Sequence, residues 1–124
     1  MKIGELAKAS GLTTSSIRFY ESAGIVAPPA RVNGIRRYEP DVANQLRLVA
    51  FYRSCGVSIP EIATIFGAAT GRRRETAHGA VRRRIDELET LIAHARSMQR
   101  RLRALQRCRC GGDRSRCVAY NAVA

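Results

Sequence analysis

The stretch MKIGELAKASGLTTSSIRFYE, residues 1–21, decides the fold. Apolar residues recur at helical spacing from Ile3 to Ser10, and Gly11 follows as a C-terminal stop because glycine adopts a positive φ at little cost. Thr13 is placed as the N-cap of a second helix, which continues from Ser16 to Ala23. Two short helices around a glycine-containing turn predict a helix-turn-helix.

A short basic hairpin is expected next. Pro28-Pro29 forbids a helix, and the segment Arg31 to Tyr38 contains Asn33-Gly34, which is a hairpin turn signal. A hairpin beside a helix-turn-helix is a wing. The sequence thus predicts a winged helix-turn-helix.

Two further helices complete this region. Pro40 is predicted at the first position of a helix that runs to about Ser54 and is closed by Gly56. Ser58-Ile-Pro-Glu61 has the pattern of a capping box at the start of a fourth helix, Ile59 to Phe66. Cys55 is interpreted as a small buried residue.

Composition limits the classes of function. The chain has 124 residues, a net charge of +12 and 45% hydrophobic residues, so we expect one domain or two small ones with a packed core. The sequence has no apolar run of the length a membrane span needs and no signal-peptide pattern, so we expect a cytoplasmic protein that does not contact a membrane. A basic protein of this size most often binds nucleic acid.

The charge is unevenly distributed: residues 1–70 carry a net +3 and residues 71–124 a net +9. We place a boundary at the composition shift, Gly67 to Arg74. The predicted parts are a DNA-binding domain at 1–70, a linker and dimerisation helix at 71–107, and a Cys-containing effector loop and tail at 108–124. Val118 to Ala124 are expected to form a short closing helix.

A long helix is predicted from Glu75 to Arg107, roughly 50 Å at about 1.5 Å per residue. Its apolar residues follow a heptad-like spacing. Since one helix cannot bury such a stripe on itself, we infer a homodimer; the alternative is that the stripe packs back onto the first 70 residues. The stripe residues are Val81, Ile85, Leu88, Ile92, Ala95, Met98, Leu102 and Leu105.

Three cysteines follow this helix within ten residues, in the segment Cys108-Arg-Cys110-Gly-Gly-Asp-Arg-Ser-Arg-Cys117. Gly111-Gly112 offers a turn that brings the sulfurs onto one soft metal ion. We expect the arginines at positions 107, 109, 114 and 116 to favour the thiolates. The alternatives are a disordered basic tail or a structural zinc knuckle.

DNA contact requires small polar and basic groups at the start of a recognition helix, and basic groups in the wing. Tyr20 is a phosphate contact or, alternatively, a core residue. The full set of predicted DNA contacts is Thr14, Ser15, Ser16, Arg18, Tyr20, Arg31, Asn33, Arg36, Arg37, Tyr38 and Arg53.

These residues resemble the MerR family of transcriptional regulators. The resemblance rests on Met1 to Thr13, Ile17-Arg-Phe-Tyr-Glu21, the wing residues from Pro28 to Tyr38, and Gly56 to Ile62. The long helix and Cys loop resemble the metal-sensing branch. The implied fold is mainly α, with the long helices paired in an antiparallel coiled coil.

The resemblance also implies a mechanism. A dimer binds a pseudo-palindromic promoter in double-stranded DNA, and the effector-bound form distorts the DNA so that RNA polymerase can use it. The same resemblance supports Arg18, Tyr20, Arg31, Arg37 and Tyr38 as DNA contacts by position.

The family's metal sites suggest several effectors. Cys117 pairs with Cys108 or Cys110, and Cys110-Gly-Gly-Asp113 resembles the loop of copper sensors. Divalent-metal members add a partner cysteine near the position of Arg74, where His78, one turn further on, could substitute. The leading effectors are Cu(I), Ag(I) or Au(I), followed by Hg(II), Pb(II), Cd(II) or Zn(II) bound by all three cysteines.

Three other functions are weighed against metal sensing. A thiol-redox or electrophile sensor needs only one activated thiolate. A purely architectural DNA-binding protein would not need the cysteines. An enzyme is disfavoured, because the sequence has neither a phosphate-binding glycine loop nor a nucleophile–base motif.

Overall fold

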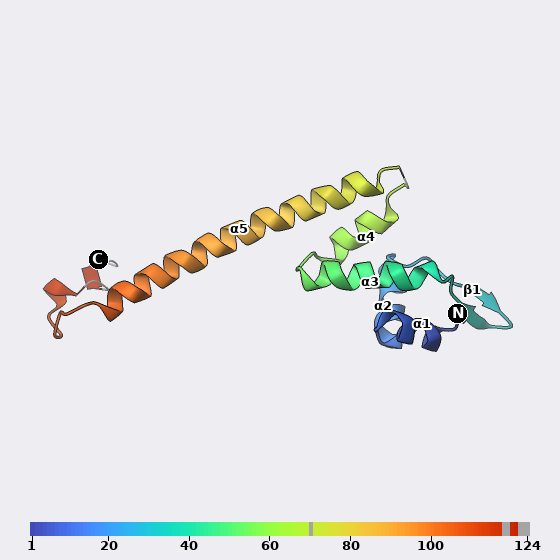
Figure 1. Cartoon of the computed structure of the whole chain (residues 1–124), viewed down its shortest axis with the longest axis horizontal. Coiled ribbons are helices and arrows are strands. Elements are labelled where there is room, and N and C mark those ends of the chain that lie inside the picture. Colours follow the sequence, from blue (N-terminus) through green and yellow to red (C-terminus); the bar gives the residue numbers. More distant parts are fainter. Residues whose placement is uncertain (70, 118–119, 122–124) are drawn as a thin grey trace. The chain divides into compact units, whose positions relative to one another are not determined.

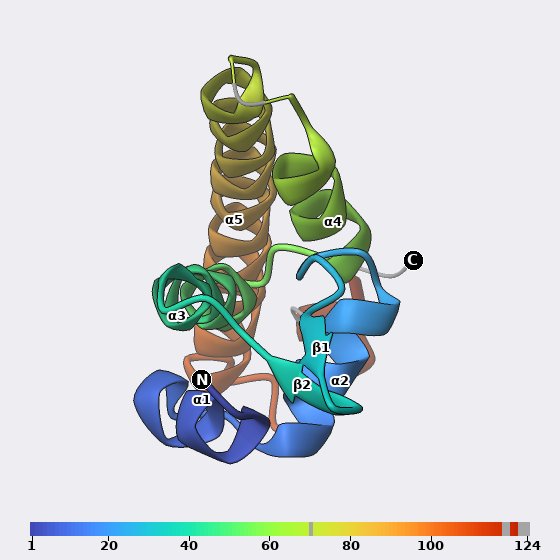
Figure 2. The ribbon, with the colours of Figure 1, turned by 90° about the vertical axis from the view of Figure 1, so that its right-hand side faces the viewer.

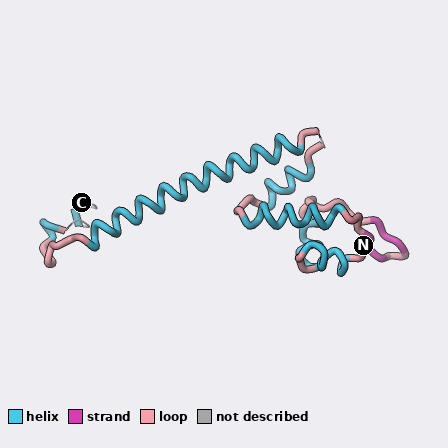
Figure 3. Tube along the Cα trace, viewed as in Figure 1, coloured by secondary structure: helices cyan, strands magenta, loops and turns pink. Residues whose placement is uncertain are grey.

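The computed structural model describes residues 1–69, 71–117 and 120–121. It divides into two compact units, Met1–Arg84 and Ile85–Ala124, which are treated separately below. Most of the described residues are helical, and the strands found among them form one hairpin (Figures 1 and 3). The elements are α1 (Ile3–Ser10), α2 (Thr14–Ser22), β1 (Ala30–Val32), β2 (Ile35–Arg37), α3 (Asp41–Ser54), α4 (Ile59–Gly67), α5 (Arg73–Gln106) and the 3-10 helix η1 (Arg114–Arg116).

The helix-turn-helix forms where the sequence predicts it. Gly11 has φ 75° and its N–H donates to the Ala7 carbonyl, which ends α1. The Thr13 hydroxyl oxygen accepts from the Ser16 N–H at 3.1 Å and caps α2. Both signals act within one turn of helix, so local chemistry is sufficient to set these ends.

The wing is an antiparallel hairpin. Asn33 and Gly34 have φ of 51° and 76°, which is the pair of positive values that a type I′ turn requires. Its register pairs Ala30 with Arg37, Arg31 with Arg36, and Val32 with Ile35. The hairpin lies beside the N-terminal end of the chain (Figure 2).

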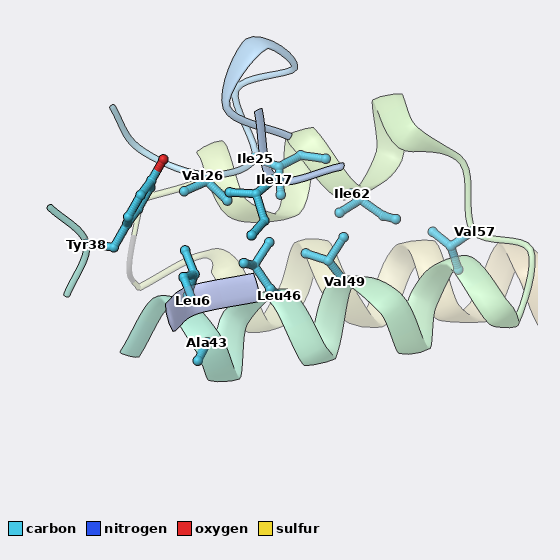
Figure 4. Packing of buried hydrophobic residues seen from close by; sticks show 10 residues of the cluster. All are labelled: Leu6, Ile17, Ile25, Val26, Tyr38, Ala43, Leu46, Val49, Val57 and Ile62. Carbon is cyan, nitrogen blue, oxygen red and sulfur yellow. The ribbon is translucent and has the colours of Figure 1, made fainter. Parts of the chain in front are cut away.

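One small core holds the first unit together. Leu6 of α1, Ile17 of α2, Leu46 and Val49 of α3 and Ile62 of α4 are each fully buried. Figure 4 shows their side chains converging between the helices. Packing of the amphipathic faces, rather than the propensity of such short helices, therefore stabilises this unit.

Two local expectations are corrected. Pro40 is the N-cap of α3, not its first helical residue, and the helix begins at Asp41. Cys55 is exposed, not buried, because it is the C-cap of α3 and the chain turns directly after it through Gly56, whose φ is 82°. The Ser58 cap is confirmed: its hydroxyl accepts from the Glu61 N–H at 3.3 Å.

The helix α5 has 34 residues, about 51 Å at roughly 1.5 Å per residue. Its first turns, through Arg84, belong to the first compact unit. Among the helices of the described residues, none combines the length and apolar character that crossing a bilayer requires. Stripe residues Val81, Ile85, Leu88, Ile92, Met98, Leu102 and Leu105 are exposed in the single chain.

Candidate metal centre and DNA-binding face

The Cys loop begins where α5 ends. The Cys108 N–H donates to the Leu105 carbonyl at 3.2 Å, which turns the chain off the helix. Gly111 and Gly112 have φ of 55° and 89°, and the Asp113 N–H donates to the Cys110 carbonyl at 2.9 Å. Two successive left-handed residues reverse the chain, which explains the glycine pair.

Asp113 returns the chain toward the first two cysteines. Its carboxylate accepts from the Ser115 N–H at 3.0 Å and from the Ser115 hydroxyl at 2.7 Å, and this cap starts η1. The Cys117 N–H donates to the Arg114 carbonyl at 3.3 Å at the end of η1. The loop therefore places Cys117 next to the cysteines from which it is separated in sequence.

The three loop sulfurs converge. The Sγ atoms of Cys108, Cys110 and Cys117 all lie within 4.8 Å of one another, and each residue is half-buried. Three sulfurs bound at about 2.3 Å to one central ion would lie about 4.0 Å apart. The donor set thus fits a thiophilic ion after a small contraction, with all three cysteines within reach.

The sulfurs affect one another's protonation. The Gly112 N–H lowers the pKa of Cys110, but a hydrogen bond with the Cys108 thiol, burial, and a hydrogen bond with Cys117 raise it, and the net pKa is raised. The arginines at positions 107, 109, 114 and 116 are not among the causes of this shift, so the expectation that they favour the thiolates stays a prediction. Crowded sulfurs disfavour added negative charge, and a bound cation is what reverses that effect.

The residues just after the loop contact it. The Asn121 N–H donates to the Cys117 carbonyl at 3.1 Å, and its Nδ2 donates to the Ser115 carbonyl at 3.2 Å. The Arg114 guanidinium lies 5.6 Å from the centre of the Tyr120 ring. The predicted closing helix covers residues 118–124, most of which lie outside the described residues.

His78 is the one other predicted metal ligand. His78 is exposed on α5, in the first compact unit, and its predicted role in metal binding stays a prediction. Cys55 belongs to the same unit and is exposed. The one group of three or more metal-ligating side chains found among the described residues is the loop trio.

The N-terminal turn of α2 presents polar and basic groups, as recognition of DNA requires. Ser15 and Arg18 are exposed, and Thr14 and Ser16 are half-buried. The Ser16 hydroxyl accepts from the Thr13 hydroxyl at 2.9 Å, so it is tied to the cap. Arg18 and Ser15 are the side chains of this turn that project furthest into solvent.

The wing carries most of its predicted contacts at the surface. Arg31, Asn33 and Arg37 are exposed. Arg31 donates to the Gly34 carbonyl at 3.3 Å, across the turn. Arg36 is half-buried, and its Nε lies 3.7 Å from a Glu21 carboxylate oxygen. The wing is thus a compact basic projection.

The two predicted tyrosine contacts belong to the core. Tyr20 is half-buried against the core cluster. Tyr38 is 4% exposed and its hydroxyl donates to the Glu21 carboxylate. Burial and this hydrogen bond raise the pKa of Tyr38 to about 12. The hydroxyl is already engaged inside the protein, so the structure favours a positioning role for Tyr38 over contact with DNA.

Arginines elsewhere bind the fold's own backbone. Arg53 is exposed and donates to the Val57 carbonyl at 3.1 Å, and its predicted phosphate contact stays a prediction. Arg47 of α3 donates to the Ala9 carbonyl at 2.6 Å, which holds the end of α1. The sequence could not show which arginines bind the protein's own backbone, because partners such as the Ala9 carbonyl of Arg47 come within reach only in the folded chain.

Comparison with known proteins decides the family. The description "MerR HTH family regulatory protein" matches residues 1–69, and "MerR, DNA binding" matches residues 43–105. The chain belongs to the MerR family of transcriptional regulators. The winged helix-turn-helix predicted from the sequence is thereby confirmed as the DNA-binding part of a MerR regulator.

Its MerR relatives match along nearly the whole chain. The HTH-type transcriptional regulator CueR of Salmonella typhimurium is 36% identical over 118 residues, covering 93% of this chain and 85% of the relative. The heavy metal-dependent transcription regulator 2 of Rhizobium meliloti is 32% identical over 127 residues, covering 100% and 86%. These relatives are transcriptional regulators.

A solved MerR-family structure matches the fold. The transcription regulator PbrR691 from Ralstonia metallidurans, crystallised in complex with lead(II), superposes with a TM-score of 0.68 at 26% identity, covering 100% of this chain and 99% of that one. The match extends through the region of the Cys loop. The chain is therefore similar in fold to this relative.

Proposed function

We propose that this chain is a metal-responsive transcriptional regulator that binds promoter DNA as a homodimer and senses a thiophilic metal ion at Cys108, Cys110 and Cys117. The observation that carries the proposal is the convergence of the three Sγ atoms within 4.8 Å. The similarity to a heavy metal-dependent regulator and to a lead(II)-bound regulator supports the same reading.

The convergence of the three cysteine sulfurs favours a three-coordinate ion. A linear two-coordinate ion such as Cu(I), Ag(I) or Au(I) needs Cys117 and only one of Cys108 and Cys110, and would leave the third sulfur unused. Hg(II), Pb(II), Cd(II) and Zn(II) accept three thiolates. We therefore place the divalent group first, which reverses the order that the resemblance to the copper-sensor loop suggested.

A homodimer follows from the apolar stripe of α5. Leu88, Ile92 and Leu102 are 38%, 49% and 62% exposed in the single chain. Large apolar side chains at a heptad-like spacing are covered in water by a second helix. A two-fold dimer carries two winged domains and predicts a pseudo-palindromic operator.

Metal binding would then change transcription through the shape of the promoter DNA. An effector shifts an equilibrium only by its differential affinity for the two states. We propose that the metal-bound dimer favours a shape that bends and untwists the promoter, so that RNA polymerase can engage both of its elements. The basic wings hold the flanking phosphates in both states.

In vitro transcription from the chain's own promoter tests this function. We expect Hg(II) or Pb(II) to raise transcription with wild-type protein and with Cys55→Ser, because Cys55 lies outside the loop trio. Cys117→Ser should bind the promoter normally and not respond. A normal metal response from Cys117→Ser would overturn the proposed site.

The rival thiol-redox function is tested in the same assay. Oxidant is added anaerobically to metal-free protein and, in parallel, metal is added to fully reduced protein. Metal sensing predicts a response in the second arm alone. Activation by oxidant alone would identify the loop as a redox or electrophile sensor.

A further inference from the structure

A basic hollow lies between α1 and the wing. It is open to solvent, has a volume of about 520 Å³, and is lined by Lys2, Glu5, Lys8, Arg31 and Arg36 together with Ile3, Gly4, Gly34 and Ile35. Four of its side chains are cationic and one is anionic. Lys2 and Lys8 belong to neither the recognition helix nor the wing, and the sequence alone gave no reason to single them out.

The N-terminal residues are held beside the wing. The Met1 N–H group donates to the Tyr38 carbonyl at 2.8 Å, and the Tyr38 N–H donates to the Met1 carbonyl at 2.7 Å. This reciprocal pair joins residues that are 37 positions apart. It fixes the backbone of Lys2 next to the end of β2. This cation of the hollow is therefore attached to a backbone that is held in place by hydrogen bonds.

The acidic group of the hollow is already engaged. A Glu5 carboxylate oxygen accepts from the Lys2 N–H at 2.8 Å, where it caps α1. This bond and the neighbouring positive charges lower the pKa of Glu5, so the carboxylate stays ionised and fixed. A single carboxylate at the cap cannot neutralise four surrounding cations.

The strand register of the wing adds to the excess of positive charge. Arg31 and Arg36 are direct partners across the β1–β2 ladder, and like charges in that relation destabilise a hairpin. Glu21 compensates Arg36 in part, at 3.7 Å. An anion bound in the hollow would relieve the remaining repulsion and would meet Lys8 from the side of α1.

We propose that this hollow seats one phosphate of the DNA backbone, with Lys2 and Lys8 as contacts additional to those of the wing. The inference rests on the proposed DNA binding and deepens it. A phosphodiester suits the site because it is a compact anion and because the wing lies on the duplex beside it. Cation–phosphate contacts of this kind set register and affinity, not sequence preference.

The test measures operator affinity of the full chain as a function of salt. Each phosphate contact contributes about 0.9 to the slope of log K against log salt. We expect Lys8→Ala to lower the slope by about this amount and to weaken binding about eightfold at about 0.1 M salt, equally on operator and random DNA. Lys8→Arg should restore both values.

The matched control is Arg100→Ala. Arg100 is an exposed arginine of α5 in the second compact unit, and its loss changes the net charge by the same amount. We expect its slope to equal that of wild type. If wild-type protein binds its operator and the salt slope of Lys8→Ala is unchanged, this inference is overturned and the proposed function stands. If wild-type protein fails to bind DNA, the proposed function itself is overturned.

A second arm separates DNA from small anions. Inorganic phosphate is titrated into protein without DNA, and the Lys8 environment is followed by NMR. Weak binding of phosphate that Lys8→Ala abolishes, together with the changed DNA slope, supports the proposal. Phosphate binding at Lys8 with an unchanged DNA slope would show that the hollow is a small-anion site and would contradict it.

Discussion

The Nε of Arg84 donates a hydrogen bond of 2.7 Å to the carbonyl oxygen of Cys55. The two residues are 29 positions apart, and the contact ties α5 to the C-terminal end of α3. It satisfies a carbonyl at a helix end, where the helix itself provides no donor. In the same region Arg83 lies 3.6 Å from Glu61, so two successive arginines of α5 hold the DNA-binding part.

Gly56→Ala should lower the free energy of unfolding by about 1–2 kcal/mol, because an alanine in the left-handed region is strained. The φ of Gly56 is 82°, and a Cβ there would lie 2.4 Å from an Arg84 guanidinium nitrogen. Urea unfolding at a fixed protein concentration measures the effect. Gly67→Ala is the control, because a Cβ at Gly67 meets nothing within 4 Å.

A double-mutant cycle separates the two causes. If the clash with Arg84 contributes, Gly56→Ala costs less in an Arg84→Ala background than in wild type. Equal costs in both backgrounds would assign the whole effect to the backbone conformation.

Each loop cysteine should matter for metal binding. We expect Cys108→Ser, Cys110→Ser and Cys117→Ser each to weaken Hg(II) or Pb(II) binding by more than about 100-fold, since even supporting groups around a metal change affinity by about 10–100-fold. Competition titration of the reduced protein measures this. Cys55→Ser should bind as wild type does; if either Cys108→Ser or Cys110→Ser also did so, the site would be two-coordinate.

Leu88→Asp should break the dimer. Leu88 is 38% exposed in the single chain and belongs to the apolar stripe of α5, so an aspartate would place an unpaired charge in the proposed interface. Analytical ultracentrifugation should find a monomer at micromolar concentration. Thr90→Asp is the matched control, because Thr90 lies on the opposite face of the helix. A dimeric Leu88→Asp protein would contradict the proposed coiled coil.

Tyr38 should titrate at a higher pH than a tyrosine free in water. The protein has four tyrosines, and the pKa of Tyr38 is raised to about 12 by burial and by its hydrogen bond to Glu21. A raised pKa means that the fold favours the neutral phenol. The stability this provides is therefore complete below about pH 10 and is lost between about pH 10 and 12.

Absorbance of tyrosinate near 295 nm follows this titration. Tyr38→Phe should remove the late component, and Glu21→Gln should shift it to lower pH, because the carboxylate no longer opposes the phenolate. A wild-type titration with no late component would show that Tyr38 is accessible to solvent and available to a ligand.

Some parts of the candidate sites could be predicted from the sequence and others could not. The Cys loop could be singled out because three cysteines in ten residues with a glycine pair form a local pattern. Which of Cys108 and Cys110 accompanies Cys117 was left open, and the turn at Gly111-Gly112 with the Asp113 cap brings both to it. The burial of Tyr38 could not be predicted, because an aromatic residue in a basic wing looks the same in sequence whether it points outward or inward, and its predicted DNA contact stays a prediction.

The sequence by itself determined the elements: Gly11, Thr13, Asn33-Gly34 and Ser58 act on backbone groups within a few residues, so their effect needs no knowledge of the fold. Only the tertiary structure decided which polar groups from distant parts of the sequence meet. Arg84 donates to the Cys55 carbonyl, Lys2 lines the same hollow as the wing residues, and the Glu21 carboxylate accepts from the Tyr38 hydroxyl. No local sequence pattern predicts these contacts, because the partners are far apart in the chain. Such contacts depend on how the apolar faces pack, because packing alone brings distant polar side chains within hydrogen-bonding range.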